Sequence, residues 1–144
     1  MKADAQTEAA VMAVLDRLAK SYSQRDWEGL RAVLAPDPDV LMYGTQADEK
    51  RIGLAEIKAQ AERDWSQSQA GSIEYAWTMV SAAGDVAWAA ADVDFKATVE
   101  GQDLTLPGRV TAVLEKRGDQ WLITQSHFSF PAPGPEGESF PGSS

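Results

Sequence analysis

The sequence contains no cysteine, which excludes disulfide bonds, thiolate nucleophiles and zinc sites built from cysteine. It contains a single histidine, His127, so a metal site that needs two histidine ligands is excluded as well. No apolar run is long enough to cross a membrane, and the first residues lack the apolar core of a signal peptide. We therefore expect a cytoplasmic protein with no metal site, no cofactor and no membrane partner.

Basic residues are also scarce, with 13 lysines and arginines against 22 aspartates and glutamates, for a net charge of −9. The basic residues are scattered along the chain, whereas a nucleic-acid-binding protein normally presents a basic patch. No phosphate-binding loop, nucleophile elbow or zinc-binding helix motif occurs. We therefore expect no nucleic-acid partner, and the motifs name no reaction.

The 144 residues, of which 44% are hydrophobic, are enough for one domain with its own core. We expect this domain over residues 1–131, followed by a tail rich in proline, glycine and serine over residues 132–144. Apolar residues at helical spacing predict helices over residues 7–23, 27–35 and 54–68. Extended patterns predict strands over residues 40–43, 51–52, 72–79, 86–99, 104–115 and 121–130. Helices followed by an antiparallel meander indicate an α+β domain.

The last predicted strand carries His127, whose ordinary pKa suits it to act as an acid or a base near neutrality. Simple alternation places Trp121, Ile123, Gln125, His127 and Ser129 on one face of this strand. Either face of the strand could be the core. His127 is therefore a candidate catalytic residue in a pocket, or a histidine that is hydrogen-bonded within the sheet.

Two neighbouring strands carry further charged candidates. Arg109 lies in an otherwise apolar strand, where it could bind the carboxylate of a ligand or pair with Asp92 or Asp94. Asp92 and Asp94 share one face, and two carboxylates so close could raise one pKa and produce a general acid or base. The alternative is that both aspartates lie on a solvated outer face of the sheet. Asp92 is retained as a catalytic candidate.

Aromatic residues are the remaining ligand-binding candidates. Tyr43, Trp65 and Trp88 could contact a flat ligand, although core packing would also explain them. The mixed-charge segment 48–51 is expected to be a solvated turn or to form the rim of a pocket.

Several short motifs follow one another along the chain: Gln24-Arg-Asp26-Trp27-Glu-Gly-Leu30, Ala35-Pro-Asp37, Tyr43-Gly44-Thr45, Asp48-Glu49-Lys-Arg51-Ile-Gly53, and Arg109…Trp121…His127-Phe-Ser129. Together they resemble the SnoaL-like branch of the NTF2-like (nuclear transport factor 2-like) superfamily, over about residues 7–131. The resemblance implies a cone-shaped α+β barrel, with N-terminal helices packed on a curved antiparallel sheet, and a deep pocket. It also implies a homodimer built on the outer face of the sheet.

Members of this superfamily include isomerases, cyclases, dehydratases, binding modules and oligomerisation domains, so the resemblance does not determine the function. Ketosteroid isomerase uses a tyrosine, a base aspartate and a protonated aspartic acid. In this chain their places fall near Leu18, near Met42, and at Arg109 or Thr111, so none is retained and that mechanism is not expected. The association domain of calcium/calmodulin-dependent kinase II, an assembly hub, shares the closing Trp…His-x-Ser pattern.

Two functions therefore remain open. One is a SnoaL-like protein with a mostly apolar pocket for a small molecule bearing a carbonyl or carboxylate, with acid–base chemistry of the isomerase, cyclase or lyase type if it is an enzyme. In that case Arg109 would orient the ligand, and His127 or Asp92 would move a proton. The other is a non-catalytic module for dimerisation, assembly or ligand binding.

Overall fold

The computed structural model describes residues 1–140, which form three helices and six strands. In chain order these are α1 (Ala5–Ser23), α2 (Trp27–Val33), β1 (Leu41–Tyr43), β2 (Lys50–Ile52), α3 (Leu54–Ser66), β3 (Ala70–Ala83), β4 (Val86–Val99), β5 (Gln102–Arg117) and β6 (Gln120–Ser129). None of the helices in this part of the chain is both long and apolar enough to span a membrane.

Local sequence sets where the first two helices begin and where the second ends. The side chain of Asp4 accepts a hydrogen bond from the backbone of Thr7 (2.7 Å), and Asp26 caps α2 in the same way through Gly29 (3.1 Å). Helix α2 ends two residues before the predicted boundary. The following residues turn to the sheet instead, where Ala35 donates its backbone N–H to Ile123 (2.8 Å).

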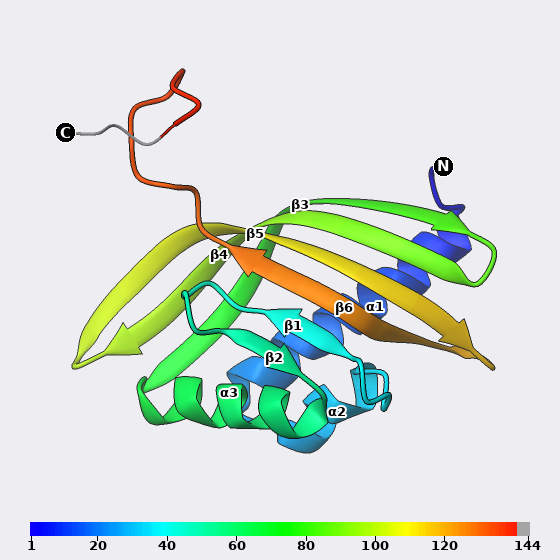
Figure 1. Cartoon of the computed structure of the whole chain (residues 1–144), viewed down its shortest axis with the longest axis horizontal. Coiled ribbons are helices and arrows are strands. Elements are labelled where there is room, and N and C mark those ends of the chain that lie inside the picture. Colours follow the sequence, from blue (N-terminus) through cyan, green and yellow to red (C-terminus); the bar gives the residue numbers. More distant parts are fainter. Residues whose placement is uncertain (141–144) are drawn as a thin grey trace.

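The strands form one curved, unclosed sheet in the order β2-β1-β6-β5-β4-β3. All neighbouring strands run antiparallel except β1 and β6, which are parallel. The sheet arches over the three helices, and residues 131–140 leave the end of β6 on the side away from them (Figure 1). The predicted α+β class, with N-terminal helices packed on a curved sheet, is confirmed.

The core lies between the helices and the concave face of the sheet. Helix α1 turns Val11, Leu15 and Leu18 toward the sheet, and all three are buried. The central strands contribute small and branched side chains to the same core, among them Ala89 of β4 and Leu114 of β5. Short side chains such as that of Ala89 leave room for the larger residues of the helices, as the close packing of a protein core requires.

A β-bulge in β3 changes which residues of that strand face the helices. Tyr75 pairs with Val93 and Trp77 pairs with Asp92, so Ala76 between them has no partner across the strand. Before the bulge, Tyr75 packs on the core and donates its hydroxyl to the backbone of Leu15 (2.7 Å). After it, Trp77 is exposed on the outer face. The bulge therefore places Tyr75 and Trp77 on opposite faces of the sheet, although they are two residues apart.

A second bulge does the same in β6. Leu114 pairs with Ile123 and Val113 pairs with Gln125, which leaves Thr124 as the extra residue. Trp121 and Ile123 lie in the core, whereas Gln125 and His127 are exposed. The predicted shared face for Trp121 and His127 is therefore wrong, because the bulge reverses the alternation between them.

Candidate functional site

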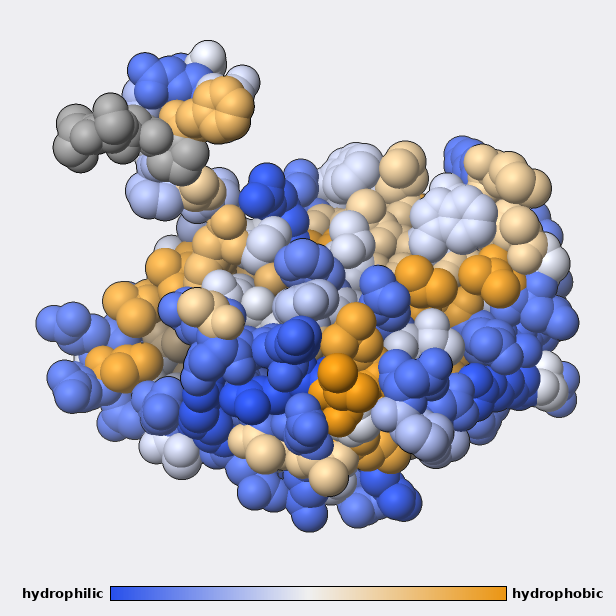
Figure 2. Space-filling model, in the orientation of Figure 1, coloured by the Kyte–Doolittle hydropathy of each residue, from blue (hydrophilic) through white to orange (hydrophobic). Residues whose placement is uncertain are grey.

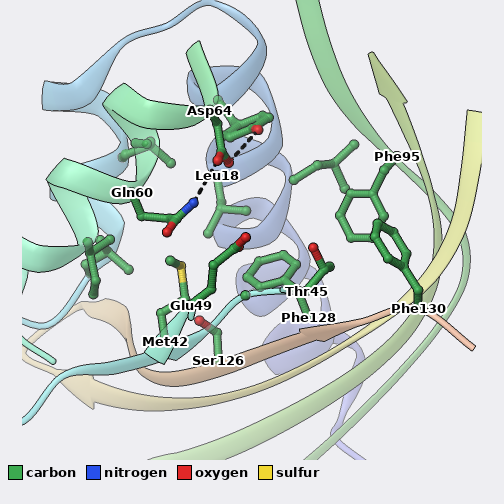
Figure 3. Close-up of a pocket in the computed structure, with 17 residues that line it drawn as sticks. Leu18, Met42, Thr45, Glu49, Gln60, Asp64, Phe95, Ser126, Phe128 and Phe130 are labelled. Carbon is green, nitrogen blue, oxygen red and sulfur yellow. Dashed lines mark hydrogen bonds between the residues drawn. The ribbon is translucent and has the colours of Figure 1, made fainter. Parts of the chain in front are cut away.

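A cavity of about 200 Å3 lies between the helices and the concave face of the sheet. Most of its wall is apolar, formed by Leu18, Leu30, Leu34, Met42, Ile57, Ala61, Ile73, Phe95, Phe128 and Phe130. The charged and strongly polar groups of the wall belong to four residues, Tyr22, Glu49, Gln60 and Asp64. Thr45 and Ser126 add hydroxyl groups to the same cavity (Figure 3). Such a cavity, apolar with a few convergent polar groups, has the composition of a small-molecule site.

Glu49 is the most unusual residue of this cavity. It is only 8% exposed, although it lies in the connection between β1 and β2, which was expected to be solvated or to form a rim. Its Oε2 accepts a hydrogen bond from Nη2 of Arg63 (3.1 Å). Within residues 1–140, Oε1 of Glu49 accepts no hydrogen bond. Every fully buried side-chain N or O atom in this range has a hydrogen-bond partner, so Oε1 is not fully buried. Oε1 is therefore open to the cavity.

Gly44 makes room for this carboxyl group. Its backbone N–H donates to the carbonyl of Glu49 (2.7 Å), which holds the two ends of the connection together. A Cβ atom at position 44 would lie 2.1 Å from Oε1 of Glu49. Any larger residue would therefore displace the carboxyl group from its place in the cavity wall.

The surroundings of Glu49 favour its protonated form. Burial raises the pKa of the carboxyl group above its ordinary value of 4.5, and the negative charge of Asp64 raises it further. The guanidinium of Arg63 opposes both effects, but the net direction is upward. Glu49 therefore keeps a proton at a higher pH than an exposed glutamate does. A general base that holds a proton during a reaction requires this property.

A chain of hydrogen bonds fixes the other polar groups. Nε of Arg51 donates to Oε1 of Gln60 (2.9 Å), whose Nε2 donates to Oδ1 of Asp64 (2.8 Å). The hydroxyl of Tyr22 donates to the other oxygen of Asp64 (2.9 Å). Burial raises the pKa of Tyr22, and the charge of Asp64 adds to this, so the hydroxyl remains protonated. The chain holds Asp64 in place from both sides.

Arg63 and Arg51, which lie beside the acidic groups of the cavity, already donate hydrogen bonds within the protein. Arg63 contacts both oxygens of Asp48 (2.8 and 3.2 Å) in addition to Glu49, and Arg51 is bound to Gln60. No lysine, arginine or histidine among the described residues lines the cavity itself. An anionic ligand would therefore meet the acidic groups of Glu49 and Asp64 in the cavity wall and no cationic side chain there.

Of the residues singled out from the sequence, five lie on or beside the outer face of the sheet rather than in this cavity: Tyr43, Trp88, Asp92, Arg109 and His127. The rings of Tyr43 and His127 lie against each other, with centroids 5.1 Å apart and planes tilted by 37°. Arg109 and Asp92 are opposite one another across β4 and β5, but no ion pair joins them in the described part of the chain. Their predicted functional roles remain predictions.

Trp65 has a supporting position behind the cavity. Its indole N–H donates to the backbone carbonyl of Tyr22 (3.0 Å), and the two rings lie 6.2 Å apart. It is not one of the residues that line the cavity, so the ligand contact predicted for it is not part of this geometry.

Replacing Asp64 with asparagine should lower the pKa of Glu49, because the negative charge of Asp64 raises it in the native protein. Carboxyl-detected NMR of both proteins between pH 3 and pH 8 would measure the shift. The control is Glu62→Gln, which removes an exposed carboxylate from the same helix and should leave the midpoint unchanged. An unchanged midpoint in the Asp64 variant would contradict this electrostatic coupling.

Comparison with known proteins agrees with this fold. A family profile described as a SnoaL-like domain matches residues 11–133. No curated protein matches the sequence. An NTF2-like superfamily protein from Salmonella enterica is similar over 96% of this chain and 100% of its own, with 19% identity and a TM-score of 0.84.

Two further solved structures share the fold. One, provisionally named a scytalone dehydratase, comes from Novosphingobium aromaticivorans, with 13% identity, a TM-score of 0.77, and coverage of 88% of this chain and 85% of its own. The other, provisionally named a calcium/calmodulin-dependent protein kinase II association domain, comes from Xanthomonas campestris. It has 24% identity, a TM-score of 0.74, and coverage of 83% of this chain and 84% of its own.

Proposed function

Because this chain belongs to the SnoaL-like family of NTF2-like proteins, we propose that its cavity binds a small neutral carbonyl compound with which Glu49 exchanges a proton. The observation that carries the proposal is the carboxyl group of Glu49, which is buried, has a raised pKa and keeps Oε1 open to an apolar cavity. Perturbed carboxyl groups in a pocket are characteristic of acid–base catalysts.

The chemistry follows from the groups around the cavity. The hydroxyls of Ser126 and Thr45 can donate hydrogen bonds to the carbonyl oxygen of the ligand. The carboxylate of Glu49 then takes a proton from the carbon next to the carbonyl, and the electron pair of the broken C–H bond moves into an enolate. Return of the proton from Glu49 completes the exchange. This is the proton transfer on which isomerases and dehydratases of the lyase type depend.

A neutral carbonyl compound suits the cavity better than a carboxylate does. The arginine expected to orient a carboxylate, Arg109, lies on the outer face of the sheet, and Glu49 and Asp64 would repel an anion. Burying an unpaired charge in an apolar cavity is also costly.

Methyl NMR with two small ketones, acetophenone and cyclohexyl methyl ketone, tests the binding step. The methyl group of Met42 lies in the cavity wall, and that of Met79 lies on the outer face, so the two methionines report on the two locations. We expect either ketone to shift the Met42 signal and to leave the Met79 signal unchanged. Shifts at Met79 alone, or at neither methionine, would contradict the proposed site.

The outer face supports a second proposal, that the protein forms a homodimer through the sheet. Trp77, Met79 and Trp88 are large apolar residues that remain at least 40% exposed there. Figure 2 shows hydrophobic residues in separate groups among hydrophilic ones over the strands, whereas helix α3 along the lower edge is mostly hydrophilic. This dimer is compatible with a catalytic cavity, and it would also serve the non-catalytic assembly module that remains the alternative function.

Replacing Trp88 with glutamate should weaken this dimer by roughly 30-fold or more, because a buried tryptophan often contributes 2 kcal/mol or more at an interface. Sedimentation equilibrium would measure the change in dissociation constant. Ile52→Glu is the control, since Ile52 is exposed on the edge strand β2, away from the central strands. A native protein that is monomeric at micromolar concentration would contradict the dimer.

A further inference from the structure

The volume of the cavity suits a ligand of about one ring. A cavity of about 150 Å3 lined by apolar side chains holds a single benzene molecule, whereas pockets for drug-sized ligands measure about 300–1,000 Å3. The cavity of this protein, at about 200 Å3, lies between these two sizes and closer to the first. A ring with one short substituent fits this volume, which is below the range of pockets for drug-sized ligands.

Three phenylalanines make the end of the cavity formed by β4 and β6 aromatic. The ring of Phe95 meets that of Phe130 edge-on, with centroids 5.4 Å apart and planes at 87°, and that of Phe128 at 6.1 Å and 53°. Aromatic rings prefer these tilted and edge-to-face contacts, and each pair gains energy beyond its buried area. A flat aromatic ring can therefore extend the cluster, whereas a puckered saturated ring gains only the burial.

Gly108 allows Phe95 to occupy this position. A Cβ atom at residue 108 would lie 2.3 Å from Cε2 of Phe95, so the ring leans directly over the glycine. The aromatic wall and the carboxyl of Glu49 both line the same cavity, and Figure 3 shows the side chains of Phe95 and Phe130 away from Gln60 and Asp64. One molecule can therefore contact both an aromatic wall and a polar wall.

We propose that the ligand is a neutral aromatic carbonyl compound with a single ring, its ring against Phe95, Phe128 and Phe130 and its carbonyl group toward Glu49. This inference rests on the proposed function and adds ring number, aromaticity and charge to it. The size comes from the cavity volume, the aromaticity from the phenylalanine cluster, and the neutrality from Glu49 and Asp64, which stand in a wall with no lysine, arginine or histidine among the described residues.

Four probes that differ in one property each would test the inference by isothermal titration at pH 7. Acetophenone is the reference, cyclohexyl methyl ketone lacks aromaticity, 2-acetonaphthone adds a second fused ring, and benzoate carries a charge. We expect acetophenone to bind most tightly. We expect 2-acetonaphthone and benzoate to bind at least about tenfold more weakly, because overpacking a filled cavity and burying an unpaired charge each cost more than 1.4 kcal/mol.

The outcomes separate this inference from the proposed function. Equal or tighter binding of benzoate, 2-acetonaphthone or cyclohexyl methyl ketone, with the Met42 signal shifted, would overturn the ligand class and leave the Glu49 site standing. Failure of both ketones to bind would overturn both proposals. Phe130→Ala enlarges the aromatic end, so we expect it to improve the binding of 2-acetonaphthone relative to acetophenone. An unchanged ratio would show that the ring does not lie against Phe130.

Discussion

Replacing Glu49 with glutamine should slow the exchange of acetophenone's methyl protons with deuterated water by roughly 10²- to 10⁴-fold, the usual contribution of a general base. Glutamine has nearly the same size and can still accept the hydrogen bond from Arg63, but it cannot take a proton. Deuterium incorporation followed by proton NMR would measure the rate.

The control for this experiment is Glu62→Gln on the exposed side of the same helix that carries Arg63, which should exchange at the native rate. The Glu49 variant should keep its affinity for acetophenone, because the hydroxyls of Thr45 and Ser126 remain. Native protein that exchanges no faster than buffer, or a Glu49 variant that exchanges at the native rate, would contradict the proton transfer.

The second large effect concerns the core that supports the cavity. Leu114→Ala should lower the free energy of unfolding by about 3 kcal/mol, since Leu114 is fully buried (0% exposed) in the central strand β5 and its loss leaves a void. Urea unfolding at neutral pH would measure the change.

The same strand provides a matched control for this substitution. Leu104 is 40% exposed near the other end of β5, so Leu104→Ala removes the same atoms from a side chain that is only partly buried. We expect Leu104→Ala to lower the free energy of unfolding by no more than about 1 kcal/mol. A leucine that stays partly exposed gains only part of the free energy of burial. Equal losses for the two variants would contradict the position of Leu114 at the centre of the core.

The fold was largely predictable because its signals are local. Helical spacing predicted α1 and α3, and the change to extended patterns after residue 71 predicted the long antiparallel strands. The direction of each side chain was less predictable. The bulges at Ala76 and Thr124 each add one residue to a strand, and neither is a glycine or proline that would mark it. For that reason the alternation placed Trp121 and His127 together, whereas the structure separates them.

The candidate site was harder to predict than the fold. Glu49 stands in a run of four charged residues, which by composition indicates a solvated turn. Its burial depends on Gly44, earlier in the same β1–β2 connection, and on Arg63 from α3, and the charge of the run indicates neither contact. One signal was available, because Gln60 and Asp64 are four residues apart on α3, beside the buried Ile57 and Ala61. Polar residues at that spacing next to an apolar stripe indicate a polar group inside the core.

The pH profile of proton exchange in the native protein tests the role of Glu49 most directly. Because the carboxylate is the base, the rate should rise as Glu49 loses its proton and then reach a plateau. The midpoint should lie above the ordinary glutamate value of 4.5, since burial and Asp64 both raise the pKa. A rate that increases in proportion to hydroxide concentration over the whole range, with no plateau, would contradict the assignment of Glu49 as the base.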